Sequence, residues 1–199
     1  MALIPINRIP QFFGSNHDLS GLFYAASYTE SLIQRTIKKY KYEPFIKDLS
    51  SSLAFLIISH LMLADKPILP IFSAAKTNTI KTSEYLLVPV PLHKKRLRWR
   101  GFNHAELLAK ELSLGLAIPL AANLLVKTKA TLAQAELSEK ERKTNVKDAF
   151  RVISPSSVKN KNILLVDDVY TTGSTLRECA KVLKKAGAFR IFGIVAARG

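Results

Sequence analysis

One stretch decides the fold of this sequence: Ile163-Leu164-Leu165-Val166-Asp167-Asp168-Val169-Tyr170-Thr171-Thr172-Gly173-Ser174-Thr175. Its apolar beginning predicts a buried strand over residues 162–166, and two carboxylates stand at the carboxyl end of that strand. A loop of small residues follows. The next helix has one apolar face, formed at the spacing i, i+3, i+4 and i+7 by Leu176, Cys179, Ala180 and Leu183. Gly187 ends this helix and residues 189–196 predict a strand, so the segment forms a right-handed parallel unit.

Further strands and helices extend this unit along the chain. Residues 85–90 form a short apolar run without alternation, which is typical of a strand covered on both faces. Helices are predicted over 45–63, over 103–113 after an N-cap at Asn103, and over 29–41, where Lys38, Lys39 and Lys41 suit the helix end. Residues 22–27 and 124–127 predict two more strands. The expected fold class is therefore α/β, with a mostly parallel sheet flanked by helices.

The composition indicates a globular chain with an unusual charge. The 199 residues include 30 Lys and Arg against 15 Asp and Glu, and 48% of all residues are apolar, which excludes wholesale disorder. Nine basic and six acidic residues lie in 1–84, whereas 21 basic and nine acidic residues lie in 85–199. The net charge of +15 disfavours an acidic scaffold and predicts a polyanionic partner, mainly for the second region.

Cysteine usage and hydropathy bear on the compartment. Cys179 is the only cysteine, which excludes an intramolecular disulfide and a multi-cysteine zinc site and fits a reducing compartment. We interpret it as a small core residue. The N-terminus lacks the pattern of a secretory signal, and the longest apolar run, residues 53–63, is too short for a membrane span of about 20 residues. A cytoplasmic protein without a membrane span is expected.

The residue types in 167–175 point to a sugar phosphate. Free N–H groups at a helix N-terminus, together with Thr and Ser hydroxyls, bind phosphate, and Gly173 lets the backbone approach closely. Asp167 and Asp168 would repel the phosphate itself, but they suit hydrogen bonds from sugar hydroxyls or a position near Mg²⁺. The alternative is an ordinary strand–loop–helix turn with polar caps. A Walker A loop is excluded because the required Lys is missing.

A second candidate segment is strongly basic. Five of the seven residues from Lys94 to Arg100 carry a positive charge: Lys94, Lys95, Arg96, Arg98 and Arg100. A cationic loop directly after a buried strand suits a pyrophosphate or a nucleic-acid backbone, and Trp99 and Phe102 would add base stacking. The alternative is a solvated charge run with the two aromatic residues packed as anchors. His93 and His104 flank the segment and are candidates for phosphate contact, but no general base is assigned.

A third candidate segment covers residues 131–150, where Gln134, Arg142 and Asn145 stand out. The pattern of residues 138–141 is a capping box that predicts a short helix. The residues alone support equally well an exposed loop and a short helix that have no functional role.

Residues 163–175 resemble the phosphoribosyl pyrophosphate (PRPP) binding motif of type I phosphoribosyltransferases. The resemblance implies that Asp167 and Asp168 contact the ribose 2′ and 3′ hydroxyls. It also implies that the 5′-phosphate is surrounded by Thr171, Thr172, Gly173, Ser174 and Thr175. Taken together, residues 87–109, 134–150 and 164–188 are similar to the competence protein ComF family, also called GntX-like. The family resemblance covers roughly residues 85–199, and it implies a type I phosphoribosyltransferase-like core there, with residues 1–84 as an N-terminal cap region.

Further expectations follow from this resemblance. The pyrophosphate loop would comprise Leu92, His93, Lys94, Lys95 and Arg96, and a mobile loop would run from Gln134 to Arg142. Mg²⁺ is expected with PRPP, whereas no catalytic residue and no protein metal ligand is assigned. Many family members begin with a four-cysteine zinc ribbon, but residues 1–30 contain no cysteine, so no zinc is expected.

The family resemblance implies a role in natural transformation, in which incoming single-stranded DNA is handled in the cytoplasm. The competence helicase and the recombination mediator are the implied protein partners, and the surplus charge suits a DNA strand, contacted through Lys94, Lys95, Arg96, Arg98, Trp99 and Arg100. The alternative is an active phosphoribosyltransferase that transfers ribose 5-phosphate to an unknown acceptor. Folds of this type commonly pair, so a homodimer stays open.

Overall fold

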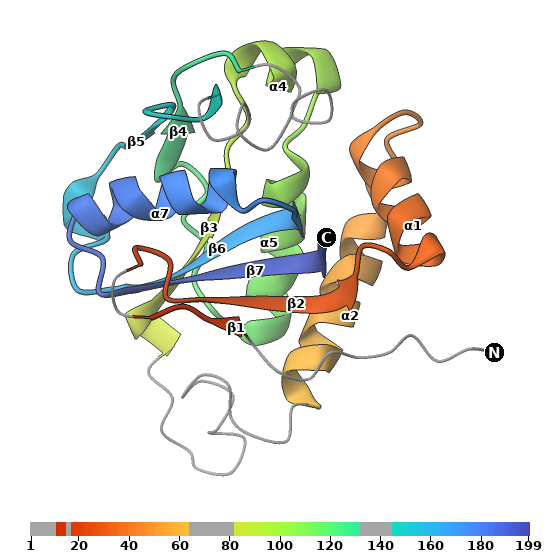
Figure 1. The fold of residues 1–199 in the computed structure, drawn as a ribbon, viewed down its shortest axis with the longest axis horizontal. Helices are drawn as coiled ribbons and strands as arrows, with labels where there is room; N and C mark the ends of the chain where they lie inside the picture. The colour runs from red at the N-terminus through yellow and green to blue at the C-terminus, as the bar shows by residue number, and fades with distance from the viewer. Residues whose placement is uncertain (1–10, 15–16, 64–81, 132–144) are drawn as a thin grey trace.

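A computed structural model of the chain describes residues 11–14, 17–63, 82–131 and 145–199. Its main sheet has five strands in the order β1-β2-β7-β6-β3 (Figure 1). Strands β2 (Gly21–Ser27), β7 (Arg190–Arg198), β6 (Asn162–Tyr170) and β3 (Tyr85–Pro89) run parallel, and β1 (Gln11–Phe12) joins the edge antiparallel. The α/β fold with a mostly parallel sheet is therefore confirmed.

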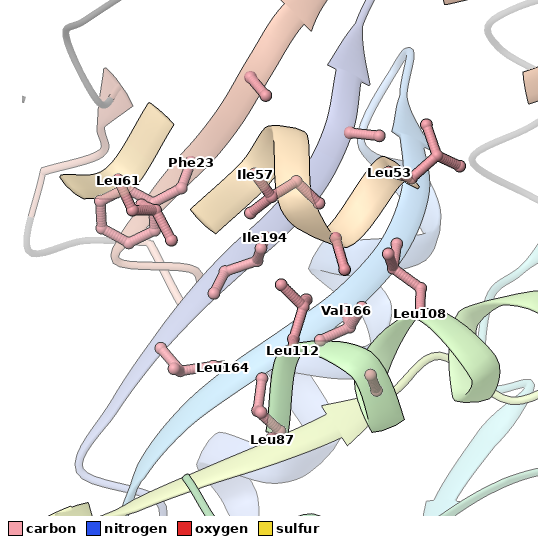
Figure 2. Packing of buried hydrophobic residues seen from close by; sticks show 14 of the residues in the cluster. Phe23, Leu53, Ile57, Leu61, Leu87, Leu108, Leu112, Leu164, Val166 and Ile194 are labelled. Carbon is pink, nitrogen blue, oxygen red and sulfur yellow. The ribbon is translucent and has the colours of Figure 1, made fainter. Parts of the chain in front are cut away.

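Three helices cover one face of the sheet. They are α1 (Ser31–Lys41), α2 (Leu49–Met62) and α5 (His104–Leu116), and they share one cluster of buried side chains with the strands. Figure 2 shows Ile57 of α2 and Leu112 of α5 pointing toward Val166 and Ile194 of the two central strands. Burial of this apolar surface anchors the helices to β6 and β7, and thereby fixes the end of α1 beside the end of β6.

The opposite face is covered by α7 (Ser174–Lys185). This helix buries the apolar face that the sequence predicts, and Cys179 within it is fully buried as a small core residue. Burial raises the pKa of the Cys179 thiol, which keeps the sulfur protonated. Because α7 follows β6 after only a short loop, its N-terminus lies at the carboxyl end of that strand.

The basic segment forms a helix, so the expectation of a loop is wrong. Helix α4 (Lys94–Arg100) follows His93, whose Nδ1 accepts a hydrogen bond from the Lys95 N–H at 3.3 Å. Gly101, with a φ of 80°, ends the helix. Lys, Arg and Leu are good helix formers, and the repulsion along α4 is reduced because Arg100 turns into the protein.

Other boundaries also differ from the prediction. Strand β6 continues to Tyr170, so the acid pair lies within the strand rather than after it. A separate two-stranded sheet forms because β4 (Leu125–Lys127) pairs antiparallel with β5 (Phe150–Val152), which was not expected. The helix predicted from residues 138–141 lies outside the described residues.

The regions 1–84 and 85–199 are joined in one sheet. Strand β2 pairs with β7 in a register that sets Leu22 opposite Gly193, and Phe23 packs against Phe192 with ring centroids 5.6 Å apart. Within the part of the chain that the structure describes, no helix combines the length and apolar content needed to cross a membrane.

Candidate anion-binding site

A cavity of about 530 Å³ opens at the carboxyl ends of β3 and β6. In open α/β sheets, this edge is where ligands bind. The walls come from α1, the segment after β3, α4, β4 and the β6–α7 loop. The lining residues include Tyr28, Lys41, Tyr42, Leu92, Arg96, Trp99, Arg100, His104, Lys127, Asp167 and residues 171–175.

The β6–α7 loop presents its backbone and hydroxyl groups to this cavity. The side-chain oxygens of Thr172 and Ser174 lie 2.9 Å apart, and all of residues 171–175 line the space. Gly173 has a φ of 73°, and a Cβ at this position would collide with the ring of Tyr170. Tyr170 is in turn held in place, because its hydroxyl accepts a hydrogen bond from Arg177 Nη2 at 2.9 Å. The loop thus forms a fixed cradle at the N-terminus of α7, where an anion is favoured.

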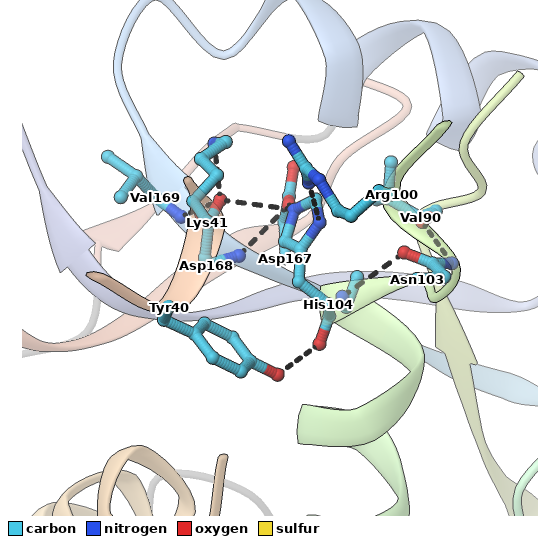
Figure 3. A network of polar contacts seen from close by, with 10 residues as sticks. Tyr40, Lys41, Val90, Arg100, Asn103, His104, Asp167, Asp168 and Val169 are labelled. Carbon is cyan, nitrogen blue, oxygen red and sulfur yellow. Dashed lines mark hydrogen bonds and ion pairs between the residues drawn. The ribbon is translucent and has the colours of Figure 1, made fainter. Parts of the chain in front are cut away.

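The two adjacent acids have different surroundings. Asp167 lines the cavity with 15% of its side chain exposed, whereas Asp168 is fully buried and does not line it. Lys41 at the end of α1 donates to Asp168 Oδ1 at 2.8 Å, and the Val169 N–H donates to the same oxygen at 2.9 Å (Figure 3). The second oxygen, Oδ2, has no hydrogen-bond partner among the described residues.

Burial and the Lys41 ammonium act in opposite directions on the pKa of Asp168. Burial alone would raise the pKa of Asp168, but the Lys41 ammonium, His104 and the hydrogen bonds to the carboxylate lower the pKa to about 2. The pKa of Lys41 is raised in return, because the two carboxylates outweigh the opposing effect of burial. The pair is therefore ionised throughout the physiological range.

His104 connects the acid pair to α4. Its Nε2 lies 3.6 Å from Asp167 Oδ1 and 3.7 Å from Asp168 Oδ1, and its Nδ1 lies 2.7 Å from Arg100 Nη1. The Tyr40 hydroxyl donates to the His104 backbone carbonyl, and the ring of His104 meets that of Tyr40 edge on (Figure 3). This network fixes α1, α4 and α5 around the base of the cavity.

A cluster of possible metal ligands forms at this point, from His104, Asp167 and Asp168, whose ligand atoms lie within 4.8 Å of one another. The cluster does not suit Mg²⁺ as a closed cage, because Lys41 already neutralises Asp168 and imidazole is a poor ligand for this hard cation. Of the two carboxylates, only that of Asp167 lines the cavity. One carboxylate together with substrate phosphates is a common environment for Mg²⁺, so Asp167 fits a magnesium ion that arrives with its ligand.

The basic segment is divided by its helix. Arg96, Trp99 and Arg100 line the cavity, while Lys94, Lys95 and Arg98 are exposed on the outside of α4. Arg100, predicted to contact nucleic acid, is only 7% exposed and faces the acid cluster instead of an outer surface.

The two aromatic residues predicted for base stacking, Trp99 and Phe102, differ in their exposure to solvent. Trp99 is 64% exposed, and its ring lies 5.5 Å from that of Phe45, edge on. Phe102 is buried, 6.0 Å from Phe45 and with the Lys47 ammonium 5.0 Å from its ring, so it is an anchor and not a stacking platform.

Some candidates lie elsewhere, and some site residues were missed. Gln134 and Arg142 lie outside the described residues. The sequence predicts Lys41 only as a charge at the end of a helix, whereas in the structure Lys41 is the ion-pair partner of Asp168. Lys127, in a short strand, gave no signal at all. No spacing pattern links these residues to the acid pair, because only the folded chain brings Lys41, Lys127 and Asp167 to one cavity.

Comparisons with known proteins agree with this geometry. The family described as phosphoribosyl transferase domain matches residues 100–198, which include the acid pair and the β6–α7 loop. The chain is 18% identical to a phosphoribosylpyrophosphate synthetase from Mycobacterium smegmatis over 87% of this chain and 52% of that one, and the TM-score of 0.40 is too low to support an argument.

Curated relatives are more similar. Competence protein F of Haemophilus influenzae is 41% identical over 62% of this chain, and DNA utilization protein YhgH of Escherichia coli is 35% identical over 78% of it. Competence protein ComFC of Bacillus subtilis is 30% identical over 78% of this chain. The matched regions span 54%, 68% and 60% of those relatives' own lengths. The chain therefore belongs to the competence protein F, ComFC and YhgH family and carries a phosphoribosyl transferase domain.

Proposed function

We propose that this chain binds PRPP in the cavity at the ends of β3 and β6, and that it acts in the handling of single-stranded DNA during natural transformation. The phosphate cradle of residues 171–175 would hold the 5′-phosphate, and Asp167 would accept hydrogen bonds from the ribose hydroxyls. Asp167 lines the cavity directly. Asp168 is buried behind it and holds the end of α1 against β6 through its ion pair with Lys41.

Mg²⁺ belongs to this proposal because PRPP carries several adjacent negative charges. The ion would neutralise part of the diphosphate charge, and Asp167 is the carboxylate that faces the space where it would lie. The observation that carries the PRPP proposal is the placement of a carboxylate and a phosphate cradle in one cavity, within the matched domain. A plain polar turn would not require a cavity of about 530 Å³ above it.

An Asp167→Asn variant tests this binding mode. Its affinity for PRPP in the presence of Mg²⁺, measured by calorimetry, should fall by about tenfold or more, because a charged acceptor for sugar hydroxyls is lost. Asp148→Asn is the matched control, since Asp148 is exposed and lies outside the cavity. Unchanged PRPP affinity in Asp167→Asn would overturn the assignment.

The proposal for DNA rests on the relatives and on charge. Two of the relatives are named competence proteins and one is named a DNA utilization protein. The exposed side of α4 carries Lys94, Lys95 and Arg98, and Trp99 is available for stacking. The proposal also includes that the protein acts in the cytoplasm, together with a competence helicase and a recombination mediator. Loss of transformation in a cell that carries Asp167→Asn would link the PRPP site to this role, and normal transformation would separate the two.

An active phosphoribosyltransferase is the second candidate. One observation favours it: Tyr28, Tyr42 and Trp99 line the same cavity as Asp167, so a planar acceptor would find aromatic surfaces beside the ribose. Turnover releases pyrophosphate, so incubation of the protein with PRPP, Mg²⁺ and a panel of nucleobases should release it above the background rate. If no nucleobase gives pyrophosphate release, the protein binds PRPP without transferring its ribose 5-phosphate to any of them.

A further inference from the structure

Lys127 of β4 is a half-buried cation without an acidic partner among the described residues. Its Nζ donates to Thr131 Oγ1 at 2.6 Å and lies 5.4 Å from the centroid of the Phe150 ring. The contrast with Lys41 is clear, because Lys41 ends on the carboxylate of Asp168 at 2.8 Å. A charged group removed from water without a counter-ion is costly, and proteins keep such groups where a ligand supplies the opposite charge.

A second cavity, of about 180 Å³, lies beside this ammonium group. Its polar lining consists of His93, Lys95, Arg96, Lys127 and Thr131, and no carboxylate lines it within the described part of the chain. It shares Leu92, Arg96, Lys127 and Thr131 with the larger cavity, so the two spaces adjoin along one wall. Its size suits a small anionic group and not a nucleobase with its sugar.

Two cations stand close together in this wall. Burial lowers the pKa of Lys127 because it removes the ammonium from water, and repulsion by the Arg96 guanidinium lowers the pKa further. The backbone holds this arrangement in place, since His93, at the start of α4, forms a parallel bridge with Lys127. Like charges held together by the fold, next to a cavity, form a site for an anion with more than one negative charge.

We propose that Lys127 of β4 is a further contact for the diphosphate of PRPP. It lies at the junction of the two cavities, beside Arg96, which the family resemblance already assigns to the pyrophosphate loop. This inference rests on the proposed function. It adds a residue of β4 to the pyrophosphate loop that the resemblance implies. Lys94, which that loop includes, lines neither cavity. PRPP would then lie with its 5′-phosphate at residues 171–175, its ribose at Asp167 and its diphosphate against Lys127.

Lys127→Met and Lys127→Arg test this contact in the full chain, with PRPP, inorganic pyrophosphate and ribose 5-phosphate as probes in calorimetry with Mg²⁺. Lys127→Met should weaken PRPP and pyrophosphate binding by about 10- to 100-fold, as expected for a lost charge-assisted hydrogen bond. Ribose 5-phosphate has no diphosphate, so its affinity should stay within about twofold. Lys127→Arg should restore part of the loss. Lys129→Met is the matched control, because Lys129 is exposed and donates to the Lys147 carbonyl.

The outcomes separate this inference from the proposed function. Unchanged pyrophosphate and PRPP affinities in Lys127→Met would overturn the contact and leave PRPP binding intact. An equal loss for ribose 5-phosphate would overturn it too, since Lys127 would then support the whole site. Weaker binding of an oligonucleotide alone would assign Lys127 to a nucleic-acid phosphate, against the proposal. Wild-type protein that binds pyrophosphate through Lys127 but not PRPP would support the contact and overturn the proposed function.

Discussion

Asp167 and Asp168 are neighbours in the chain but have separate tasks, and the geometry of β6 explains this. Successive side chains of a strand point to opposite sides, so one carboxylate faces the cavity while the other is buried toward α1 and α5. The buried carboxylate of Asp168 forms an ion pair with Lys41 and lies beside His104. A double substitution of the pair would therefore mix a loss of ligand contact with a loss of stability.

Lys41→Met should lower the free energy of unfolding by about 3 kcal/mol, because it leaves the charge of Asp168 buried and uncompensated. Urea unfolding at pH 7 measures this change. Lys39→Met is the matched control, since Lys39 is exposed on the same helix and should change stability by less than about 0.5 kcal/mol. Equal stability of the two variants would show that the ion pair contributes nothing.

The low pKa of Asp168 predicts a dependence of stability on pH. Its pKa is about 2 in the folded protein, below the ordinary value of 3.8, so the folded state binds this proton less readily than the unfolded state. The stabilisation is therefore complete above about pH 4 and is lost as the pH falls toward about 2. Urea unfolding of Asp168→Asn between these pH values should show a shallower decline than the wild type. A parallel decline would assign the acid sensitivity to other groups.

Gly173→Ala should reduce PRPP affinity by about tenfold or more, because the new Cβ collides with Tyr170 and disfavours the positive φ of the cradle. Gly101→Ala is a closely matched control. Gly101 also has a positive φ, of 80°, but apart from its two chain neighbours no atom of the described residues lies within 4 Å of the position of a Cβ there. Calorimetry with PRPP separates the two, and equal affinities would mean that the shape of the cradle is unimportant.

At the scale of the element, α4 separates two kinds of cation. Arg96 and Arg100 line the larger cavity, and the exposed Lys95 also borders the smaller one. Lys94 and Arg98 face solvent. A loop would have left all five charges interchangeable. A helix of seven residues assigns each charge to a side, so that Arg100 faces a small ligand while Lys94 and Arg98 stay accessible to a DNA strand.

Replacing Lys94, Lys95 and Arg98 together by Gln should weaken the binding of a single-stranded oligonucleotide and reduce its salt dependence. The slope of log affinity against log salt should fall by about 2, since each phosphate contact on a single strand contributes about 0.7. Fluorescence anisotropy at several salt concentrations measures both quantities. The matched control replaces Lys181, Lys184 and Lys185 of α7, which removes the same charge from another surface. A larger effect in the control would place the DNA on α7.

The elements differ in how far the sequence predicts them. Strand β6 and helix α7 were clear because their apolar residues are buried in one regular pattern. Helix α4 was missed since charge repulsion favours a loop, whereas the burial of Arg100 against His104, which permits the helix, is a tertiary contact. Strand β5 has only three residues and depends on β4 for its hydrogen bonds. The motif residues were found, but Lys41 and Lys127 needed the fold to bring them there.

For the whole molecule, the sheet makes the N-terminal region part of the core. Residues 85–199 expressed alone should fail to unfold cooperatively in circular dichroism, because removal of β2 and α2 exposes β7 and the apolar cluster around Ile194. The full chain is the reference. A cooperative transition in the fragment would show that the second region is an independent domain.

The place of β7 in the sheet also affects how the chain is made. β7 lies between β2 and β6, yet it is the last of the five strands to leave the ribosome. Until then the edge of β2 that faces β7 has no partner, and open strand edges associate with other chains. Parallel pairing of distant segments is also slow. The yield of this protein in cells should therefore respond to the supply of chaperones that cover nascent strands, even where its folded state is stable.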